Sequence, residues 1–206
     1  MKSFVTLFAL IAVAAANCPP LWTSGGRSCY RYFRGVASFD DASGVCMDHG
    51  NCNGDMARIV QIESLQESIF LQKYLSMFAA EGQRQLPSFW INLRLQPVMN
   101  PNTGSSANWW VWGDGKQLGQ QGQLPGFGIT PAPLVTPYSN FATPRLPQAN
   151  PGSCVIHTQN NQLGNYIWSP TTCAAKQNIQ AFICEMPSGA RPVGPVGPPP
   201  RRPGVV

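Results

Sequence analysis

Two neighbouring aromatic stretches dominate the hydrophobic pattern of the chain. The first, 89–93, is a short and nearly continuous apolar run between Pro87 and Pro97, which predicts a strand buried on both faces. The second, 109–115, alternates aromatic positions and stops at an Asp-Gly pair, which predicts a half-buried strand that enters a tight turn. Because one large ring removes about 150–250 Å² from water, we expect the core to form around these stretches.

Two capping boxes, each a Ser followed three residues later by an acid, predict helix starts. The first spans 38–41 and predicts a short helix with Cys46 on its buried face. The second spans 64–67 and predicts a helix that ends near Gly82. The apolar face of this second helix is expected to carry Phe70, Tyr74, Met77 and Phe78.

The remaining pattern consists of short strands and irregular segments. Strand character appears at 28–33, 154–157 and 181–184. Between them, 116–152 is rich in Gly, Gln, Pro and Thr without periodicity, which predicts a flexible insert. Residues 188–206 are almost entirely Pro, Gly, Val and Arg and predict a disordered basic tail. Helices, short strands and an insert together indicate an α+β domain.

The start of the chain indicates the compartment. Lys2, an apolar run over 4–13 and three alanines predict a signal peptide over 1–16, so we expect a secreted protein. The length of 206 residues suits a single domain, which we place at 17–187. Charged residues make up 11% of the chain, against roughly 25% in ordinary domains. The net charge of +5 is too small and scattered to indicate nucleic-acid binding, and no later stretch predicts a membrane span.

Seven cysteines in a secreted chain predict a disulfide framework with one thiol left over. A zinc site is not expected, because the sequence has no tight Cys-x-x-Cys pair and its two histidines, His49 and His157, lie far apart. Neither histidine belongs to a nucleophile motif, and Asp40 and Asp41 suit a helix N-terminus better than acid/base chemistry. We therefore expect neither an enzyme nor a cofactor.

Several short motifs, in order, resemble those of the C-type lectin-like domain. They are Cys-Tyr-Arg-Tyr-Phe at 29–33, Trp-Ile-Asn-Leu at 90–93, Trp-Gly-Asp-Gly at 112–115 and Phe-Ile-Cys-Glu at 182–185. The resemblance implies two helices, short antiparallel sheets and a long loop region at about 116–152. It also implies the disulfides Cys18 to Cys29, Cys46 to Cys184 and Cys154 to Cys173. Cys52 is then left as an idle thiol or as the source of an intermolecular disulfide.

In that family, sugar binding uses a calcium ion held by carboxylate and amide oxygens. The two tripeptides that supply these oxygens correspond here to 143–145, with Thr143 and Arg145, and to 168–170, with Ser169 and Pro170. The sequence contains no Asp or Glu between Gly115 and Cys184. We therefore expect no metal at this site and no carbohydrate binding through it.

The overall layout is similar to that of the spicule matrix proteins of sea urchins. The shared features are the start at 28–33, the Pro/Gly/Gln-rich insert and an exit at 182–189 into a basic Pro/Gly tail. This resemblance implies a structural protein of the extracellular matrix, whose partners are calcium carbonate mineral and other matrix proteins. Arg191, Arg201 and Arg202 are the candidate mineral contacts, since guanidinium groups pair with oxyanions. The alternative is a secreted lectin-like binding module that recognises glycans or proteins.

Overall fold

The computed structural model describes residues 18–49, 56–78, 86–99, 104–129, 135–159, 166–176 and 179–188. Several predictions lie outside these residues: the signal peptide at 1–16, Cys52, and the tail with Arg191, Arg201 and Arg202. Within the described residues the chain forms two helices and nine strands. In chain order these are β1 (Thr23–Gly25), β2 (Ser28–Arg34), α1 (Phe39–Met47), β3 (Arg58–Ile59), α2 (Leu65–Ser76), β4 (Ser88–Met99), β5 (Ser106–Trp112), β6 (Gln117–Gln120), β7 (Ser153–Gln159), β8 (Tyr166–Thr172) and β9 (Ile179–Pro187).

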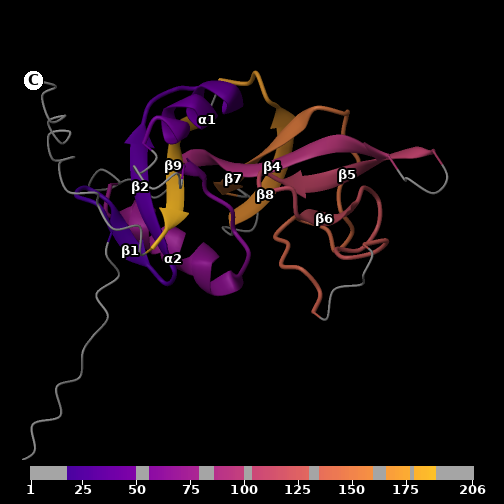
Figure 1. Ribbon diagram of the computed structural model, residues 1–206, viewed down its shortest axis with the longest axis horizontal. Coiled ribbons are helices and arrows are strands. Elements are labelled where there is room, and N and C mark those ends of the chain that lie inside the picture. Colours follow the sequence, from indigo (N-terminus) through magenta and orange to yellow (C-terminus); the bar gives the residue numbers. More distant parts are fainter. Residues whose placement is uncertain are drawn as a thin grey trace, which may run out of the picture.

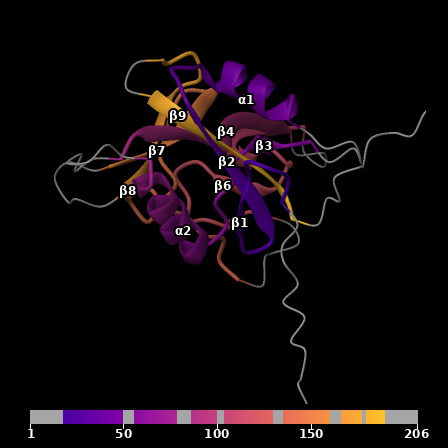
Figure 2. The same cartoon turned by 90° about the vertical axis from the view of Figure 1, so that its left-hand side faces the viewer.

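The strands form one sheet in which β4 is the central member. The main path runs β1-β2-β9-β4-β5-β6, while β3 pairs with β9, and β7 joins β4 to β8. Every pairing is antiparallel except that of β4 with β9. In two perpendicular views, α1 and α2 lie on opposite sides of the part of the sheet that contains β2 and β9 (Figures 1 and 2). The predicted α+β class is confirmed.

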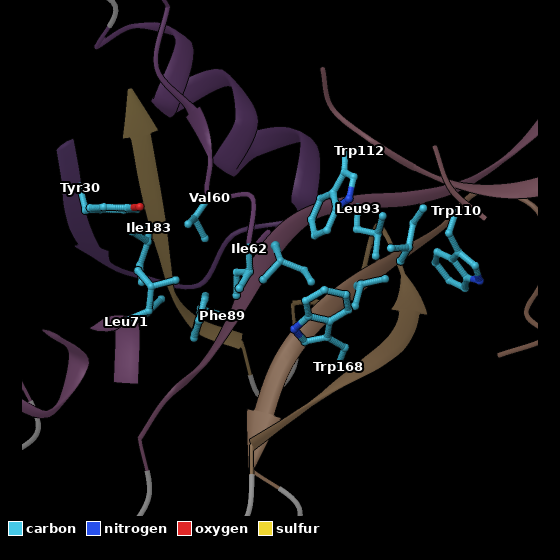
Figure 3. Close-up of a cluster of buried hydrophobic side chains, with 14 of the residues drawn as sticks. Tyr30, Val60, Ile62, Leu71, Phe89, Leu93, Trp110, Trp112, Trp168 and Ile183 are labelled. Atoms are coloured by element: carbon cyan, nitrogen blue, oxygen red, sulfur yellow. The ribbon is translucent and has the colours of Figure 1, made fainter. Parts of the chain in front are cut away.

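Alternation along β4 and β9 divides the core into two clusters, one under each helix. On β4, Phe89 and Ile91 face the cluster that includes α2, whereas Trp90 faces the cluster that includes α1. On β9, Ile183 faces the α2 side and Phe182 the α1 side. Successive strand residues point to opposite faces, so a run such as 89–93 is buried on both, as predicted. Figure 3 shows the α2-side cluster.

The prediction that β4 ends before Pro97 is wrong. The strand continues to Met99, and Pro97 lies opposite Asn108 in an antiparallel hairpin with β5. β7 reaches only as far as Arg94 on the other side of β4, so beyond that point β5 is the single partner among the described strands. A proline is tolerated there because its missing N–H would not have served a second strand.

Both helices begin at the predicted serines. Ser38 and Asp41 form a complete capping box before α1, and Cys46 lies on its buried face. Before α2 the box is only half formed. The Ser64 hydroxyl accepts from the Glu67 N–H at 3.2 Å, but the Glu67 side chain accepts from the N–H of Glu63 instead of from that of Ser64.

The predicted inner face and end of α2 need correction. The helix ends at Ser76, before Gly82, and Met77 is its C-cap. Met77 and Phe78 therefore lie past the last turn and are 67% and 47% exposed. The buried apolar positions of the helix are Leu71, Tyr74 and Leu75, and Phe70 is half-buried.

Three disulfides join distant segments of the described chain. They are Cys18–Cys29, Cys46–Cys184 and Cys154–Cys173, with Cα separations of 5.5, 5.3 and 4.9 Å. The first holds the N-terminal segment to β2, the second holds α1 to β9, and the third holds β7 to the residue after β8. These are the pairs that the lectin-like resemblance implies. No described helix is long and apolar enough to cross a membrane.

Candidate functional site

The region after β6 is the part of the molecule where the lectin-like resemblance places a ligand. We call the described residues 121–129 and 135–152 the long loop; it lies beside β6 in Figure 1. Its backbone is bonded to the strands: the Gly126 N–H donates to Leu118 O at 2.8 Å and the Gly152 N–H donates to Leu95 O at 2.9 Å. The prediction of a flexible insert is therefore wrong for these residues, because tertiary hydrogen bonds replace the missing secondary structure.

Leu146 anchors the long loop to β6. Its side chain is buried in the α2-side core cluster. Its own N–H donates to Gln123 O at 2.8 Å, and its carbonyl accepts from the Gly122 N–H at 2.7 Å. A Cβ at Gly119 would lie 2.8 Å from the Leu146 side chain, so the glycine in β6 leaves the space that this contact needs.

Trp168, a residue of β8, packs against the long loop and holds it to the sheet. The ring is 1% exposed and makes edge-on contacts with Tyr138 and Phe141 of the long loop, at centroid distances of 5.6 and 5.5 Å. It also meets Trp112 of β5 edge-on, at a centroid distance of 5.5 Å (Figure 3). The backbone N–H of Trp168 donates to Asn140 O at 2.9 Å. Edge-to-face aromatic pairs add stability beyond the area that they bury.

Sequence reasoning missed this role of Trp168 and the strand that carries it. The signal for β8 is present, since Tyr166, Ile167 and Trp168 are strand formers, but Pro170 argues against a strand. Pro170 is tolerated because β7 is the only described strand that pairs with β8. In the other predicted aromatic strand, at 109–115, the rings of Trp110 and Trp112 are buried.

The residues that replace the calcium ligands are occupied by other contacts. The Thr143 hydroxyl donates to Arg145 O at 2.7 Å, and Arg145 Nη1 donates to Gly122 O at 3.2 Å. Ser169 and Pro170 lie in the β7–β8 ladder. Among the described residues no three His, Cys, Asp or Glu side chains gather so as to hold a metal. A guanidinium, a proline and two hydroxyls do not fit calcium, which needs several carboxylate or amide oxygens.

Two cavities open in this region, and neither is lined by a charged side chain. One, of about 610 Å³, lies between the end of the long loop and β8. It is lined by Pro147, Gln148, Ala149, Asn150, Pro151, Gly152, Ser153, Pro170, Thr171 and Thr172. The other, of about 410 Å³, lies within the long loop and is lined by Leu124, Pro125, Thr136, Pro137, Ser139, Phe141, Ala142, Thr143 and Pro144. The lining groups suit neutral polar and apolar ligand groups.

Acidic side chains lie elsewhere, near α2, where the protein itself uses their oxygens. Glu185 accepts from the Ser28 hydroxyl at 2.7 Å and from the Gln61 N–H at 3.0 Å. Glu67 accepts from the Tyr30 hydroxyl at 2.7 Å. Burial raises the pKa of Glu67, although its hydrogen bonds oppose the shift. Burial and the nearby Glu67 also raise the pKa of Tyr30.

Ion pairs use four further acids. Lys116 lies between Glu63 and Asp114, at 2.8 and 3.1 Å, and the hydrogen bond to Glu63 is the main reason that its pKa is raised. Burial of Asp114 opposes its ionisation, but hydrogen bonds from Lys116 outweigh burial and lower its pKa. The other two pairs are Asp40 with Arg94, and Asp41 with Lys176 at 3.1 Å.

His157 is fully buried and lies between two rings. Phe89 stacks on it at 4.9 Å and Tyr166 at 5.3 Å. Neither of its ring nitrogens has a hydrogen-bond partner among the described residues. Burial lowers the pKa of His157 to about 4, so the imidazole is neutral at physiological pH. It is closed to a substrate. His49, the other histidine, stacks on Phe33 at 5.1 Å.

Comparison with known proteins supports the fold and its broad class. No family model matches the chain. Snaclec 3 of Sistrurus catenatus edwardsii is 29% identical over 115 residues, which cover 53% of this chain and 72% of that protein. In two further snaclecs the matched segment covers only 61% and 62% of the relative.

Solved structures with the same arrangement of elements include a mutant lectin and human lithostathine. An EPNH mutant of CEL-I matches with a TM-score of 0.52 at 18% identity, over 82% of this chain and 96% of that one. Human lithostathine gives the same TM-score and identity over 85% and 94%. CEL-I is a C-type lectin from Cucumaria echinata. The chain therefore has the C-type lectin-like fold, with two helices, a mixed sheet and three disulfides.

Proposed function

We propose that this chain is a secreted, non-catalytic lectin-like binding module that recognises proteins or glycans without the calcium site of sugar-binding lectins. The observation that carries the proposal is the long loop, which is fixed in place, opens into two uncharged cavities and has no acidic residue for calcium. A rigid loop with concave surfaces is the usual setting for recognition. The similarity to snaclecs and to a C-type lectin agrees with a binding role.

The mineral-matrix role has less support. The proteins reported above are snaclecs, the lectin CEL-I and human lithostathine, which favour the binding module over a calcium carbonate matrix protein. The three arginines proposed as mineral contacts lie outside the described residues. Asp40, Asp41 and Glu63, which could have offered oxygens to lattice calcium, are engaged in ion pairs.

The proposed organisation keeps the boundaries predicted from the sequence. A signal peptide occupies 1–16, the lectin-like domain 17–187 and a basic tail 188–206. We further propose that Cys52 forms an intermolecular disulfide, since the other six cysteines are paired within the chain. Non-reducing electrophoresis of the secreted protein tests this point, and a purely monomeric band would contradict it.

Binding of the mature protein to an array of glycans and an array of extracellular proteins tests the proposed function. Each array is probed once with calcium and once with EDTA. We expect saturable binding to a defined ligand that is equal in both buffers. Binding abolished by EDTA would contradict the calcium-free site, and no binding above a tag-only control on either array would refute the binding role. Tight adsorption on calcite that depends on 188–206 would instead favour the matrix role.

A further inference from the structure

Arg145 differs from the other cations in the described part of the chain after Gly115. Lys116 lies 2.8 Å from Glu63, and Lys176 lies 3.1 Å from Asp41. Arg145 is exposed, and no carboxylate of a described residue pairs with it. Its sequence neighbourhood offers none either, because the chain has no Asp or Glu between Gly115 and Cys184. Among the described residues nothing neutralises this guanidinium, which can therefore pair with an anion from outside.

The guanidinium is held in position by the long loop. One nitrogen, Nη1, donates to Gly122 O at 3.2 Å. The Arg145 carbonyl accepts from the Thr143 hydroxyl, and the next residue, Leu146, is bonded through both its N–H and its carbonyl. Nη2 and Nε keep N–H groups that make no bond to a described residue. Because a guanidinium presents these donors in a planar fork, it suits a carboxylate better than a point charge would.

An uncharged cavity with both apolar and hydroxyl-bearing lining residues lies in the same part of the long loop. The 410 Å³ cavity ends at Thr143 and Pro144, directly before Arg145 in the chain. Leu124 and Phe141 contribute apolar walls, and Leu124 is 52% exposed. A cavity of this size admits a side chain of the size of leucine or phenylalanine. Of the lining residues, Pro144 precedes Arg145 in the chain and Leu124 follows Gly122, the partner of the guanidinium, by two residues, so the cation and the cavity belong to the same part of the long loop.

We propose that Arg145 and the adjacent 410 Å³ cavity bind an acidic segment of a partner protein. An Asp or Glu carboxylate of the partner pairs with the guanidinium, and a neighbouring apolar side chain of the partner enters the cavity. This inference rests on the proposed binding function and specifies its partner. A sulfated glycan fits less well, because a polyanion gains affinity from many cations, and Arg145 is the one cation of the described long loop.

A titration of the isotope-labelled mature protein, followed by NMR, tests the proposal. The probe is the blocked peptide acetyl-Gly-Asp-Leu-Gly-amide, and its Asn analogue lacks only the charge. We expect saturable shifts of the Arg145 Nε–H signal and of the Phe141 and Thr143 amides, with a dissociation constant on the order of 1 mM. Arg145→Gln should weaken binding about tenfold. Arg34→Gln, at an exposed arginine on β2, is the matched control and should leave binding unchanged.

The possible outcomes separate this inference from the proposed function. Equal shifts with the Asn peptide, equal losses in both arginine variants, or no saturable shift would each overturn the role of Arg145. A heparin octasaccharide that shifts the same signals when the peptide does not would overturn the choice of partner. The array screen decides the proposed function independently. A partner found there that binds the Arg145→Gln variant normally would leave the binding role standing and refute this inference.

Discussion

The helical half of the molecule and its long-loop half are stabilised in different ways. Around α1 and α2, several carboxylates pair with Ser, Tyr, Lys or Arg side chains, as in the pairs Glu67 with Tyr30 and Lys116 with Glu63. The long loop has no acids, and backbone hydrogen bonds and the rings around Trp168 hold it in place. A loop without regular structure can thus be rigid when buried rings fix it at a few points.

The sharpest test of this contrast is removal of the ring that fixes the loop. Trp168→Ala should lower the free energy of unfolding by about 3–5 kcal/mol, because it leaves a large cavity among Trp112, Tyr138 and Phe141. Denaturant unfolding followed by far-UV circular dichroism measures the effect. Trp109→Ala, at a half-buried ring, is the control and should cost much less. If the alanine variant fails to fold, Trp168→Phe should fold with a smaller loss. Equal losses at both tryptophans would contradict the special role of Trp168.

The second prediction concerns pH. Burial lowers the pKa of His157 to about 4 from the usual 6.5, so the unfolded state binds the proton more readily than the folded state. The stability due to neutral His157 is complete above pH 6.5 and falls as the pH drops toward 4. The full loss corresponds to about 3 kcal/mol.

His157→Phe should flatten this dependence between pH 7 and 4, because phenylalanine does not titrate and fits between Phe89 and Tyr166. Melting temperature measured across the range provides the readout. Tyr166→Phe, which keeps a ring beside His157, serves as the control, and its pH profile should follow that of the unmodified protein. A profile for His157→Phe as steep as that of the unmodified protein would rule out His157 as the cause.

A smaller effect is expected from the ion pairs of the helical half. Lys116→Met removes the contacts to Glu63 and Asp114, but Lys116 is 62% exposed and water screens the interaction. We expect a loss of about 0.5–1 kcal/mol at low salt, and less at high salt. Lys73→Met, at an exposed helix position, is the matched control in the same denaturant titration. A loss that does not change with salt would indicate packing rather than charge.

The smallest expected effect is that of calcium. Because the long loop supplies no carboxylate, millimolar calcium should shift the unfolding free energy by less than about 0.3 kcal/mol relative to EDTA. Differential scanning fluorimetry in the two buffers measures the shift. Magnesium at the same concentration controls for ionic strength. A stabilisation specific to calcium that grows with its concentration would show a site formed by other oxygens.

The sequence by itself determined the features that local chemistry specifies. Ser38 and Ser64 begin helices because their hydroxyls bond to backbone N–H groups three residues on. The apolar run at 89–93 is buried on both faces because both sides of β4 are covered. The cysteine pattern and the ordered motifs were sufficient to predict the lectin-like fold and its three disulfides.

Only the tertiary structure decided what depends on distant partners. Pro170 argues against a strand until β7 is seen as the single described partner of β8, and Pro97 argues for a strand end until the hairpin with β5 is seen. The insert has no periodicity, so nothing local predicts that Trp168 and Leu146 hold it in place. Whether Arg145 meets a carboxylate likewise depends on which residues lie near it in space. Contacts between residues far apart in sequence form only when the chain folds, so local sequence patterns cannot predict them.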